Sequence, residues 1–307
     1  MTGTADVSVI IPAWRAADTV GRALASVAAQ TVKPREAIVV DDGSDDGTAD
    51  AARAMAAAMG GIDLKVIALV ANAGAGAARN RAISEARGEF VALLDADDEW
   101  LPEKLARSLA VMAESGADLV SHDYVEIRAG RETVGRCARH CPPGADPFDA
   151  QLLKGFIANI TVVARRRLVL AAGGFDPGLR SGQDYELWLS VCGDPDLRFR
   201  AFPEALSRYH IREGSISTDV LRRRRAALAI LHRHLGLIRR RSRTPFRHAL
   251  TRAAIVHAQA AAAYAGRGRY VSAALELAIA PFTLVGVAAA FGAPPFRRPD
   301  YLGTASR

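Results

Sequence analysis

Four short apolar runs in the first 115 residues constrain the fold of this chain more than any other feature. They are residues 7–11, 37–40, 64–70 and 90–94. Helical patterns separate them at residues 18–30, 48–59, 76–87 and 102–115, with Asp18 as the expected N-cap of the first. Strands this apolar are typical of a sheet covered on both faces, so the alternation predicts an α/β fold with a mostly parallel, Rossmann-like sheet.

The residues that follow each run hold the candidate chemistry. In a parallel sheet, ligands bind beyond the carboxyl ends of the strands. The segments after the four runs are 12–15, 41–48, 72–80 and 95–98, and they contain acidic and Gly-rich clusters. A random surface would scatter such clusters, so we expect one functional edge on the sheet.

The most informative cluster is Asp95-Ala96-Asp97-Asp98, directly after the fourth run. Carboxylates packed at a strand end repel one another and favour a bound cation. Hard oxygen ligands suit Mg²⁺ or Mn²⁺, which often take their remaining ligands from substrate phosphates and water. The alternative is a solvated turn that leads into the helix after Pro102.

Two further segments suggest nucleotide binding. Asp41-Asp42-Gly43 could hydrogen-bond a sugar or a base edge, or could simply connect a strand to a capped helix. Gly74 and Gly76 resemble part of a phosphate-binding turn but lack its third glycine. Arg79 could reach a phosphate or pair with the acids at the strand ends.

Beyond residue 116 the pattern loosens. We expect strands at 118–128 and 159–165, paired strands within 198–209, and a short helix at 185–192. Residues 129–150 are expected to form a loop. This stretch holds Cys137, His140 and Cys141, but no second ligand pair lies nearby, so a loop is favoured over a zinc site. A helical hairpin is expected over 246–265 and 270–291.

Together, several segments resemble the family 2 glycosyltransferases, which are inverting sugar transferases of the GT-A nucleotide-diphospho-sugar transferase fold. The segments are residues 7–12, 39–48, 72–80, 93–98, 173–176 and 183–189. The resemblance covers about residues 6–218. It implies a GT-A catalytic domain over 1–218, with a nucleotide-binding half at about 1–115 and an acceptor half at about 116–218. Residues 219–307 would form a basic, Ala-rich C-terminal α-helical appendage.

The resemblance also implies how a nucleotide-diphospho-sugar donor would be held. Pro12, Ala13 and Asp42 would line the base and ribose of the nucleotide. Arg79 would lie near the donor phosphates or sugar.

The same resemblance assigns the acidic residues. Asp95 and Asp97 would form the D-x-D pair, with Asp97 the more direct ligand of Mg²⁺ or Mn²⁺ and Asp95 nearer the ribose or a bound water. Asp98 would orient the sugar or the acceptor. Asp184 would be the general base, although it could also be a helix N-cap.

This chain departs from the family pattern near two of these positions. Gln183 stands where the family has the first acid of an E-D pair, so one charge beside the base is missing. Arg212 stands where the family often has His, and His210 where it often has Arg. Arg212 is always cationic and cannot be a metal ligand, but it could clamp diphosphate oxygens, and we favour it over His210 for that contact.

The function that the resemblance implies is inverting transfer of a sugar to an acceptor hydroxyl, in the synthesis of cell-surface glycan or polysaccharide on a glycan or lipid-linked acceptor. One alternative is a nucleotidyltransferase, which would lack the Gln183-Asp184 segment. Another is a non-catalytic sugar-nucleotide-binding module, against which the retained acids argue.

The charge of the chain is divided unevenly. Residues 219–307 hold 16 basic and 3 acidic side chains, a net charge of +13. The whole chain has a net charge of +7, so residues 1–218 have a net charge of −6. The basic region is expected to pack on the body as a hairpin or to rest on an anionic membrane surface, rather than to span a membrane or to bind nucleic acid. Three cysteines and no signal-peptide pattern favour a cytoplasmic protein, peripheral at the inner face of the membrane.

Overall fold

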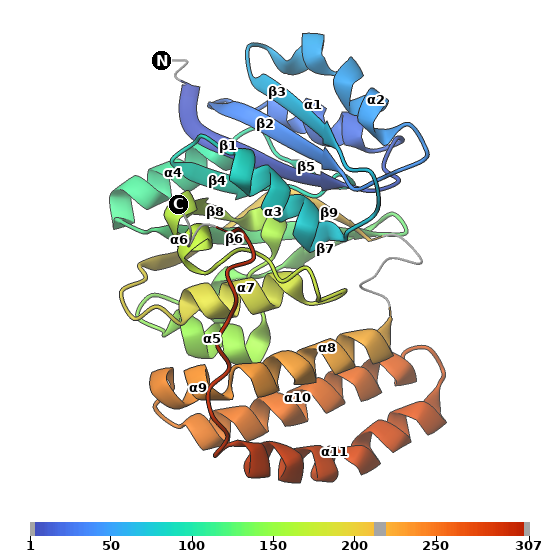
Figure 1. Ribbon diagram of the computed structural model, residues 1–307, viewed down its shortest axis with the longest axis vertical. Coiled ribbons are helices and arrows are strands. Elements are labelled where there is room, and N and C mark those ends of the chain that lie inside the picture. Colours follow the sequence, from blue (N-terminus) through green and yellow to red (C-terminus); the bar gives the residue numbers. More distant parts are fainter. Residues whose placement is uncertain (1–3, 212–218, 304–307) are drawn as a thin grey trace.

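The computed structural model describes residues 4–211 and 219–303, and shows a twisted sheet between helices with a helical layer beyond them (Figure 1). The sheet has the strand order β3-β2-β1-β4-β8-β6-β9-β5, and β7 pairs with β6. The strands are β1 (Thr4–Ala13), β2 (Lys33–Asp41), β3 (Asp63–Ala68), β4 (Phe90–Leu93), β5 (Glu99–Trp100), β6 (Leu119–Arg128), β7 (Arg131–Gly135), β8 (Val163–Arg165) and β9 (Phe199–Ile211). β1 pairs in parallel with β2 and β4, and β2 with β3, so the predicted parallel core is confirmed.

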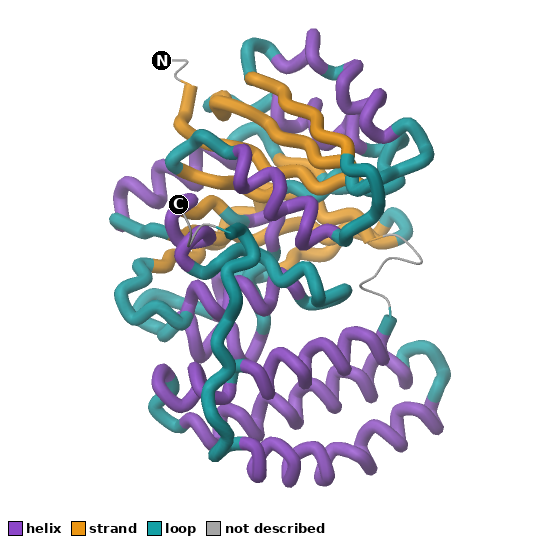
Figure 2. The backbone as a smooth tube through the Cα atoms, viewed as in Figure 1, coloured by secondary structure: helices purple, strands orange, loops and turns teal. Residues whose placement is uncertain are grey.

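Helices cover both faces of this sheet, as Figure 2 shows by secondary structure. They are α1 (Val20–Ala28), α2 (Thr48–Ala54), α3 (Ala75–Glu85), α4 (Lys104–Ser115), α5 (Pro147–Lys154), α6 (Arg166–Ala171), α7 (Gln183–Cys192), α8 (Val220–Arg233), α9 (Leu235–Arg241), α10 (Pro245–Ala265) and α11 (Tyr270–Ala290). Successive side chains of a strand point to opposite faces. Thus Ile10 and Ile38 belong to a core shared with α3 and α7, whereas Val9 and Val39 belong to a core shared with α1. Both faces are apolar, which explains the continuous apolar runs.

Several sequence-based expectations about individual elements were wrong. Residues 198–209 lie in one long strand, β9, instead of two paired strands. The expected loop at 129–150 contains β7 and the start of α5. The N-cap position of the first helix is Thr19, not Asp18. The expected strand at 159–165 begins as a 3₁₀ turn before β8.

The strand register brings the predicted functional segments to one edge of the sheet. Ala13 at the end of β1 pairs with Asp41 at the end of β2. On the other side of β1, Ile10 pairs with Leu93, so the acidic segment that begins at Asp95 leaves the sheet beside the same edge. The ends of three strands therefore deliver their polar residues to one place.

The C-terminal helices pack against the body formed by the sheet and its helices rather than away from it. The hairpin of α10 and α11 is confirmed, and Figure 1 shows it with α8 and α9 beyond α5 and α7. Ile230 of α8, Ile238 of α9 and Ala249 of α10 are fully buried in the same cluster as Leu187 and Trp188 of α7. This contact buries one side of α7 against the helical layer.

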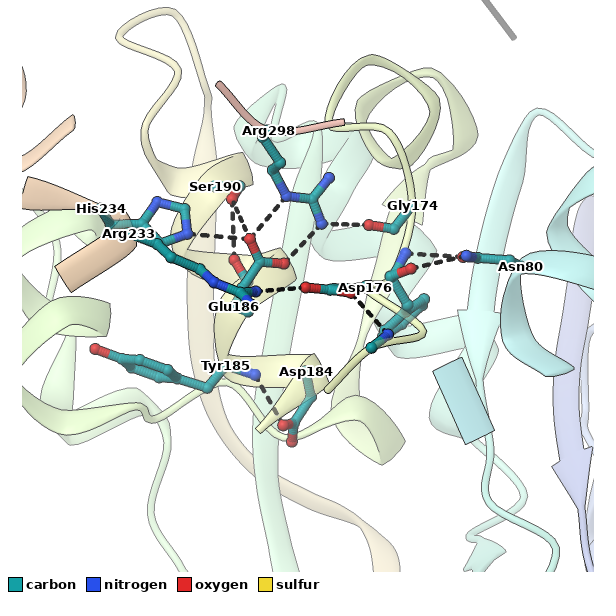
Figure 3. Close-up of polar contacts among 12 residues, drawn as sticks. Asn80, Gly174, Asp176, Asp184, Tyr185, Glu186, Ser190, Arg233, His234 and Arg298 are labelled. Atoms are coloured by element: carbon teal, nitrogen blue, oxygen red, sulfur yellow. Dashed lines mark hydrogen bonds and ion pairs between the residues drawn. The ribbon is translucent and has the colours of Figure 1, made fainter. Parts of the chain in front are cut away.

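A buried carboxylate on α7 fixes this packing (Figure 3). Glu186 is 1% exposed and accepts hydrogen bonds from His234 Nε2 at 3.0 Å, Arg298 Nε at 2.8 Å and Arg298 Nη2 at 2.7 Å. Burial alone would raise the pKa of Glu186, but the hydrogen bonds from Arg298 and His234 outweigh it and hold that pKa at about 2. The carboxylate is thus charged and ties both the α8–α9 junction and the C-terminal segment to α7.

A second set of contacts holds the turn at residues 173–176, which precedes α7. Arg233 Nη1 donates to Asp176 Oδ2 at 2.6 Å, and Tyr301 N donates to Gly173 O at 2.8 Å (Figure 3 shows the Arg233 contact). The turn at residues 173–176 is therefore held between the C-terminal segment and α8.

We predict that Arg298→Gln lowers the free energy of unfolding by about 3 kcal/mol, because it leaves Glu186 buried with half of its partners. Urea denaturation at neutral pH measures the change. The matched control is Arg297→Gln, which removes the same charge from the exposed neighbouring residue. Equal stability of the two variants would contradict a role for the buried ion pair.

Candidate active site

The end of β2 organises the loop that follows β3. Asp42 is 2% exposed, and its Oδ1 and Oδ2 accept hydrogen bonds from Ala73 N and Gly74 N, each at 2.8 Å. Its own backbone N–H donates to Ala13 O at 2.8 Å, beside the buried Pro12. The structure therefore brings Pro12, Ala13 and Asp42 together, as the sequence predicts, and it adds that Asp42 holds the residue 72–74 loop over them.

Gly43 lets these two segments approach closely. Its φ of +72° lies in the left-handed region, and a Cβ there would lie 2.6 Å from the carbonyl carbon of Ala71. Only glycine satisfies both conditions without displacing backbone. The Asp-Asp-Gly sequence is therefore required by the loop geometry as well as by any ligand.

Arg79 is the centre of the site. It lies on α3, is 8% exposed, and reaches Asp95 Oδ1 with Nη2 at 2.6 Å and Gln183 Oε1 with Nη1 at 3.3 Å. Its guanidinium lies 5.3 Å from the centroid of the Phe175 ring. Arg79 thus joins the end of β4 to the start of α7. The two partners, Asp95 and Gln183, are 88 residues apart in the sequence.

The residues that support Arg79 were not assigned roles from the sequence. Asn80 accepts from Phe175 N at 2.7 Å and donates to Phe175 O at 2.8 Å, which fixes the ring behind Arg79. A Cβ on Gly174 would lie 2.6 Å from Asn80 Oδ1, so this glycine admits the amide. The Gly173-Gly174 pair was the only sequence signal for this contact.

The acidic segment after β4 divides into two kinds of carboxylate. Asp95 and Asp97 are half-buried at the edge of the sheet, whereas Asp98 is fully buried and accepts a hydrogen bond from His210 N at 2.8 Å. Burial first, and then the negative charges of Asp95 and Asp97, raise the pKa of Asp98 well above its usual value. Asp98 therefore anchors β9 in the structure, and its contact with a sugar stays a prediction.

The chemistry of Asp95 and Asp97 fits a divalent cation. Within residues 4–211 and 219–303, no three acidic, His or Cys side chains are grouped closely enough to bind a metal by themselves. Mg²⁺ and Mn²⁺ at nucleotide sites commonly take one or two carboxylates and complete their coordination with phosphate oxygens and water. Asp95 and Asp97 are partly exposed, and their negative charges raise the pKa of Asp98. They offer only oxygen ligands, too few to complete the coordination of a cation without phosphate or water.

Asp184 lies in the first turn of α7, next to this cluster. The helix is capped by Gly182, so the N-cap alternative for Asp184 is wrong. Asp184 Oδ1 accepts from Tyr185 N at 2.8 Å (Figure 3). Burial is the main effect that raises the pKa of Asp184, with Arg79 lowering it and Asp95 raising it further. The carboxylate therefore shares an electrostatic environment with Arg79 and Asp95.

The remaining candidates are less involved. The ring of His210 is turned to Glu99, with Nε2 3.1 Å from Oε1. Arg212 lies outside the described residues. Cys137 and Cys141 are buried, and burial raises the pKa of their thiols to about 12 and about 11, respectively. Cys137 Sγ donates a hydrogen bond to Phe156 O at 3.0 Å. Protonated, hydrogen-bonded thiols explain why this stretch is structural.

We predict that Gly43→Ala lowers the thermal midpoint by several degrees, through a loss of about 2 kcal/mol from strain and collision. Gly47→Ala is the matched control, because Gly47 also has a positive φ of +86° but a Cβ there meets nothing within 4 Å. Differential scanning fluorimetry of both variants separates backbone strain from collision. A Gly43 variant no less stable than the Gly47 variant would contradict the close approach of the residue 72–74 loop.

Solved structures with the same arrangement support the GT-A fold. TarS from S. aureus in complex with UDP-GlcNAc superposes with a TM-score of 0.68 at 20% identity, over 93% of this chain and 80% of that one. A mannosyltransferase from Pyrobaculum calidifontis, in complex with GDP-Man and Mn²⁺, gives a TM-score of 0.63 at 22% identity over the same shares. At this identity the likeness concerns the fold.

Sequence relatives are closer. The succinoglycan biosynthesis protein ExoO of Rhizobium meliloti is 37% identical over 69% of this chain, and the match spans 62% of ExoO, less than two thirds of its length. The UDP-Glc:alpha-D-GlcNAc-diphosphoundecaprenol beta-1,3-glucosyltransferase WfgD of Escherichia coli is 30% identical, over 69% of this chain and 80% of WfgD. TuaG of Bacillus subtilis, a putative teichuronic acid biosynthesis glycosyltransferase, is 32% identical over 69% and 82%.

The family model described as Glycosyl transferase family 2 matches residues 8–167, more than half of the chain. That span includes the ends of β1, β2 and β4 and therefore Asp42, Arg79 and the acidic segment from Asp95. The chain belongs to glycosyl transferase family 2.

Proposed function

We propose that this protein transfers a sugar from a nucleotide-diphospho-sugar to an acceptor hydroxyl, with inversion, in the synthesis of a cell-surface polysaccharide. The observation that carries the proposal is the contact of Arg79 with Asp95 and Gln183, because it puts donor-side acids beside Asp184. The names of the relatives in succinoglycan, teichuronic acid and lipid-linked glycan synthesis support the acceptor class.

On the donor side, Pro12, Ala13 and Asp42 would line the base and ribose. Arg79 would contact the diphosphate, and Asp95 and Asp97 would hold Mg²⁺ or Mn²⁺. When bound, this ion would supply positive charge to the diphosphate as it leaves. Support comes from the half-exposed carboxylates at the strand edge and from the Mn²⁺ of the mannosyltransferase structure.

Gln183 gives Arg79 a neutral hydrogen-bond partner in place of a second acid. Arg79 Nη1 meets the neutral amide oxygen of Gln183, so Asp95 is its one ion-pair partner among the described residues. An acid at residue 183 would add a second negative charge to the same guanidinium. We infer that the neutral partner leaves more of the Arg79 charge available to donor phosphates.

On the acceptor side, Asp184 would take the proton of the acceptor hydroxyl as its oxygen attacks the anomeric carbon. A carboxyl group whose pKa is raised by burial binds a proton more readily than an ordinary Asp, which suits this task. One displacement from the side opposite the diphosphate inverts the anomeric centre. Arg212 lies outside the described residues, so its contact with the diphosphate stays a prediction.

We predict that Asp184→Asn lowers the rate of sugar transfer about a hundredfold or more, while Mn²⁺-dependent binding of nucleotide diphosphates is retained. Asp196→Asn, an exposed substitution just past α7, is the control. Because the base must be deprotonated, kcat/KM of the wild type should fall as pH falls through a pKa above the ordinary 3.8. Near-normal turnover of the Asp184 variant would contradict the assignment of the base and would favour a non-catalytic role for this acid.

The membrane expectation for residues 219–307 becomes specific to α11. Within the described parts of the chain, α11 is the single helix long and apolar enough to cross a bilayer. Its inward side mixes the buried Val287 with polar contacts: Glu276 pairs with Arg224 and His257, and Thr283 bonds His257 Nε2 at 2.9 Å. Its outward side is apolar, with Val271 77%, Phe282 78% and Val285 69% exposed.

The exposed apolar outer side and the buried charge of Glu276 support a helix that lies in the membrane interface. Spanning the bilayer would require breaking the buried Glu276 contacts, which is costly. Arginines flank both ends of α11, with Arg267 and Arg269 before it and Arg297 after it, and would contact anionic headgroups. We therefore propose that the enzyme is cytoplasmic and peripheral, and that α11 seats it on an anionic bilayer.

We predict that Val285→Glu reduces co-sedimentation with phosphatidylglycerol vesicles about tenfold, because the new carboxylate would have to enter the apolar interface. Val134→Glu is the control, since Val134 is also exposed but lies on β7 of the catalytic body. Binding that is equal for both variants would contradict a membrane role for α11.

A further inference from the structure

A cationic cavity of about 480 Å³ lies between the turn before α7 and the first turns of α8. Its charged lining is Arg180 from the turn, and Arg222, Arg225 and Asp219 from the start of α8. The apolar part of the lining includes Leu179 and Leu221. The cavity therefore combines three guanidinium groups and one carboxylate with an apolar wall.

The charges of this cavity are poorly neutralised by the protein. Arg222 Nε lies 3.5 Å from Asp219 Oδ2, and both side chains are about half exposed. For Arg180 and Arg225, the described residues provide no ion-pair partner, and Arg180 Nη1 reaches only Asn72 Oδ1, at 3.5 Å. Guanidinium groups bind phosphate oxygens through paired hydrogen bonds, so an anion with several oxygens fits this lining.

The cavity adjoins the active site on its acceptor side. Arg180 and Ser181 line it, and Asp184 follows three residues after Ser181, in the first turn of α7. Across the opening, Arg180 faces the residue 72–74 loop that Asp42 holds, since its Nη1 lies 3.6 Å from the position of a Cβ on Gly74. A ligand in the cavity would therefore lie between the segment that leads into α7, the helix that carries the proposed base, and the start of α8.

The same cavity opens at the end of the helical layer where α11 begins. Val220, next to the lining residue Leu221, is packed with Ala260 and Tyr264 of α10 and with Ala273 of α11. Figure 1 shows the starts of α8 and α11 at the same end of this layer. An apolar chain leaving the cavity past the exposed Leu221 would therefore emerge at the end of the layer where α11 begins.

We propose that this cavity binds the diphosphate of a lipid-linked acceptor, with Arg180, Arg222 and Arg225 on the phosphates and the lipid directed toward α11. The proposal rests on the proposed function, and it names the acceptor class of that same site. It places two diphosphates on opposite sides of the sugar: the donor diphosphate near Arg79 and the acceptor diphosphate near Arg225. The acceptor hydroxyl then approaches Asp184 from the α8 side.

Direct binding tests the proposal without requiring turnover. Farnesyl diphosphate, farnesol and inorganic pyrophosphate are titrated into the full chain by calorimetry in EDTA, which prevents metal-dependent binding at the donor site. We expect Arg180→Gln/Arg225→Gln to weaken farnesyl diphosphate binding by about tenfold or more, because two charged contacts are lost. Arg243→Gln/Arg247→Gln is the matched control, since these exposed arginines lie at the opposite end of α10 from Tyr264.

The three probes separate the sources of affinity. Farnesyl diphosphate that binds more tightly than both farnesol and pyrophosphate, and that loses this advantage only in the cavity variant, supports a lipid diphosphate site. Equal binding of pyrophosphate and farnesyl diphosphate overturns the lipid part of the proposal. Equal losses in the cavity and control variants overturn the site itself.

A separate titration with UDP or GDP and Mn²⁺ keeps this test independent of the proposed function. The cavity variant should still bind nucleotide, because Arg225 lies on α8 and Arg180 reaches the residue 72–74 loop only through Asn72 Oδ1, at 3.5 Å. Loss of nucleotide binding in the cavity variant alone would show that these arginines serve the donor, and would overturn the acceptor assignment. Failure of the wild type to bind any nucleotide would count against the proposed function instead.

Discussion

The buried position of Arg79 is the constraint on which the site depends. A guanidinium that is 8% exposed must be satisfied by its surroundings, because leaving a buried charge unpaired costs several kcal/mol. Asp95, Gln183 and the face of Phe175 provide these partners, and they come from three separate parts of the chain. The requirement to neutralise one cation therefore aligns the end of β4, the start of α7 and the Gly-rich turn before it.

The C-terminal helices extend this arrangement instead of merely following it. Glu186 lies on the same helix as Asp184, and its carboxylate is held by His234 and Arg298 (Figure 3). The first turn of α7 faces the strand edge, and the buried side of α7 faces the helical layer. Any shift of the layer would therefore move the helix that carries the proposed base, so the basic region helps to position Asp184.

Much of the fold could be predicted from the sequence because the signals there are local. The four apolar strands and their intervening helices each carry their own pattern, and parallel pairing brings their polar ends together without further information. The same reasoning failed where a pattern was weak. β7 is short, polar and mostly exposed, so it shows no apolar alternation. α5 had a usable signal in Asp146-Pro147, where the Asp146 side chain accepts from Phe148 N at 2.8 Å.

The site shows a similar division. The acids and Arg79 could be found because they follow strands or match a family pattern. The supporting contacts could not, because Asn80 with Phe175 and Glu186 with Arg298 join residues 95 and 112 positions apart. Such pairs depend on tertiary packing, and a single sequence contains no local trace of them. β9 was misjudged for the same reason, since its pairing with β6 shifts register near His122 and Asp123.

The distance between Glu186 and Arg298 has a consequence for synthesis of the protein on the ribosome. The arginine is translated 112 residues after the glutamate, a delay on the order of ten seconds at the usual rate of elongation. During that interval the Glu186 carboxylate lacks its principal partner and has to remain hydrated, so α7 cannot settle into its final packing. The nascent chain can form the parallel sheet early, but the packing of the helix that carries Asp184 is completed only when the segment around Arg298 reaches Glu186.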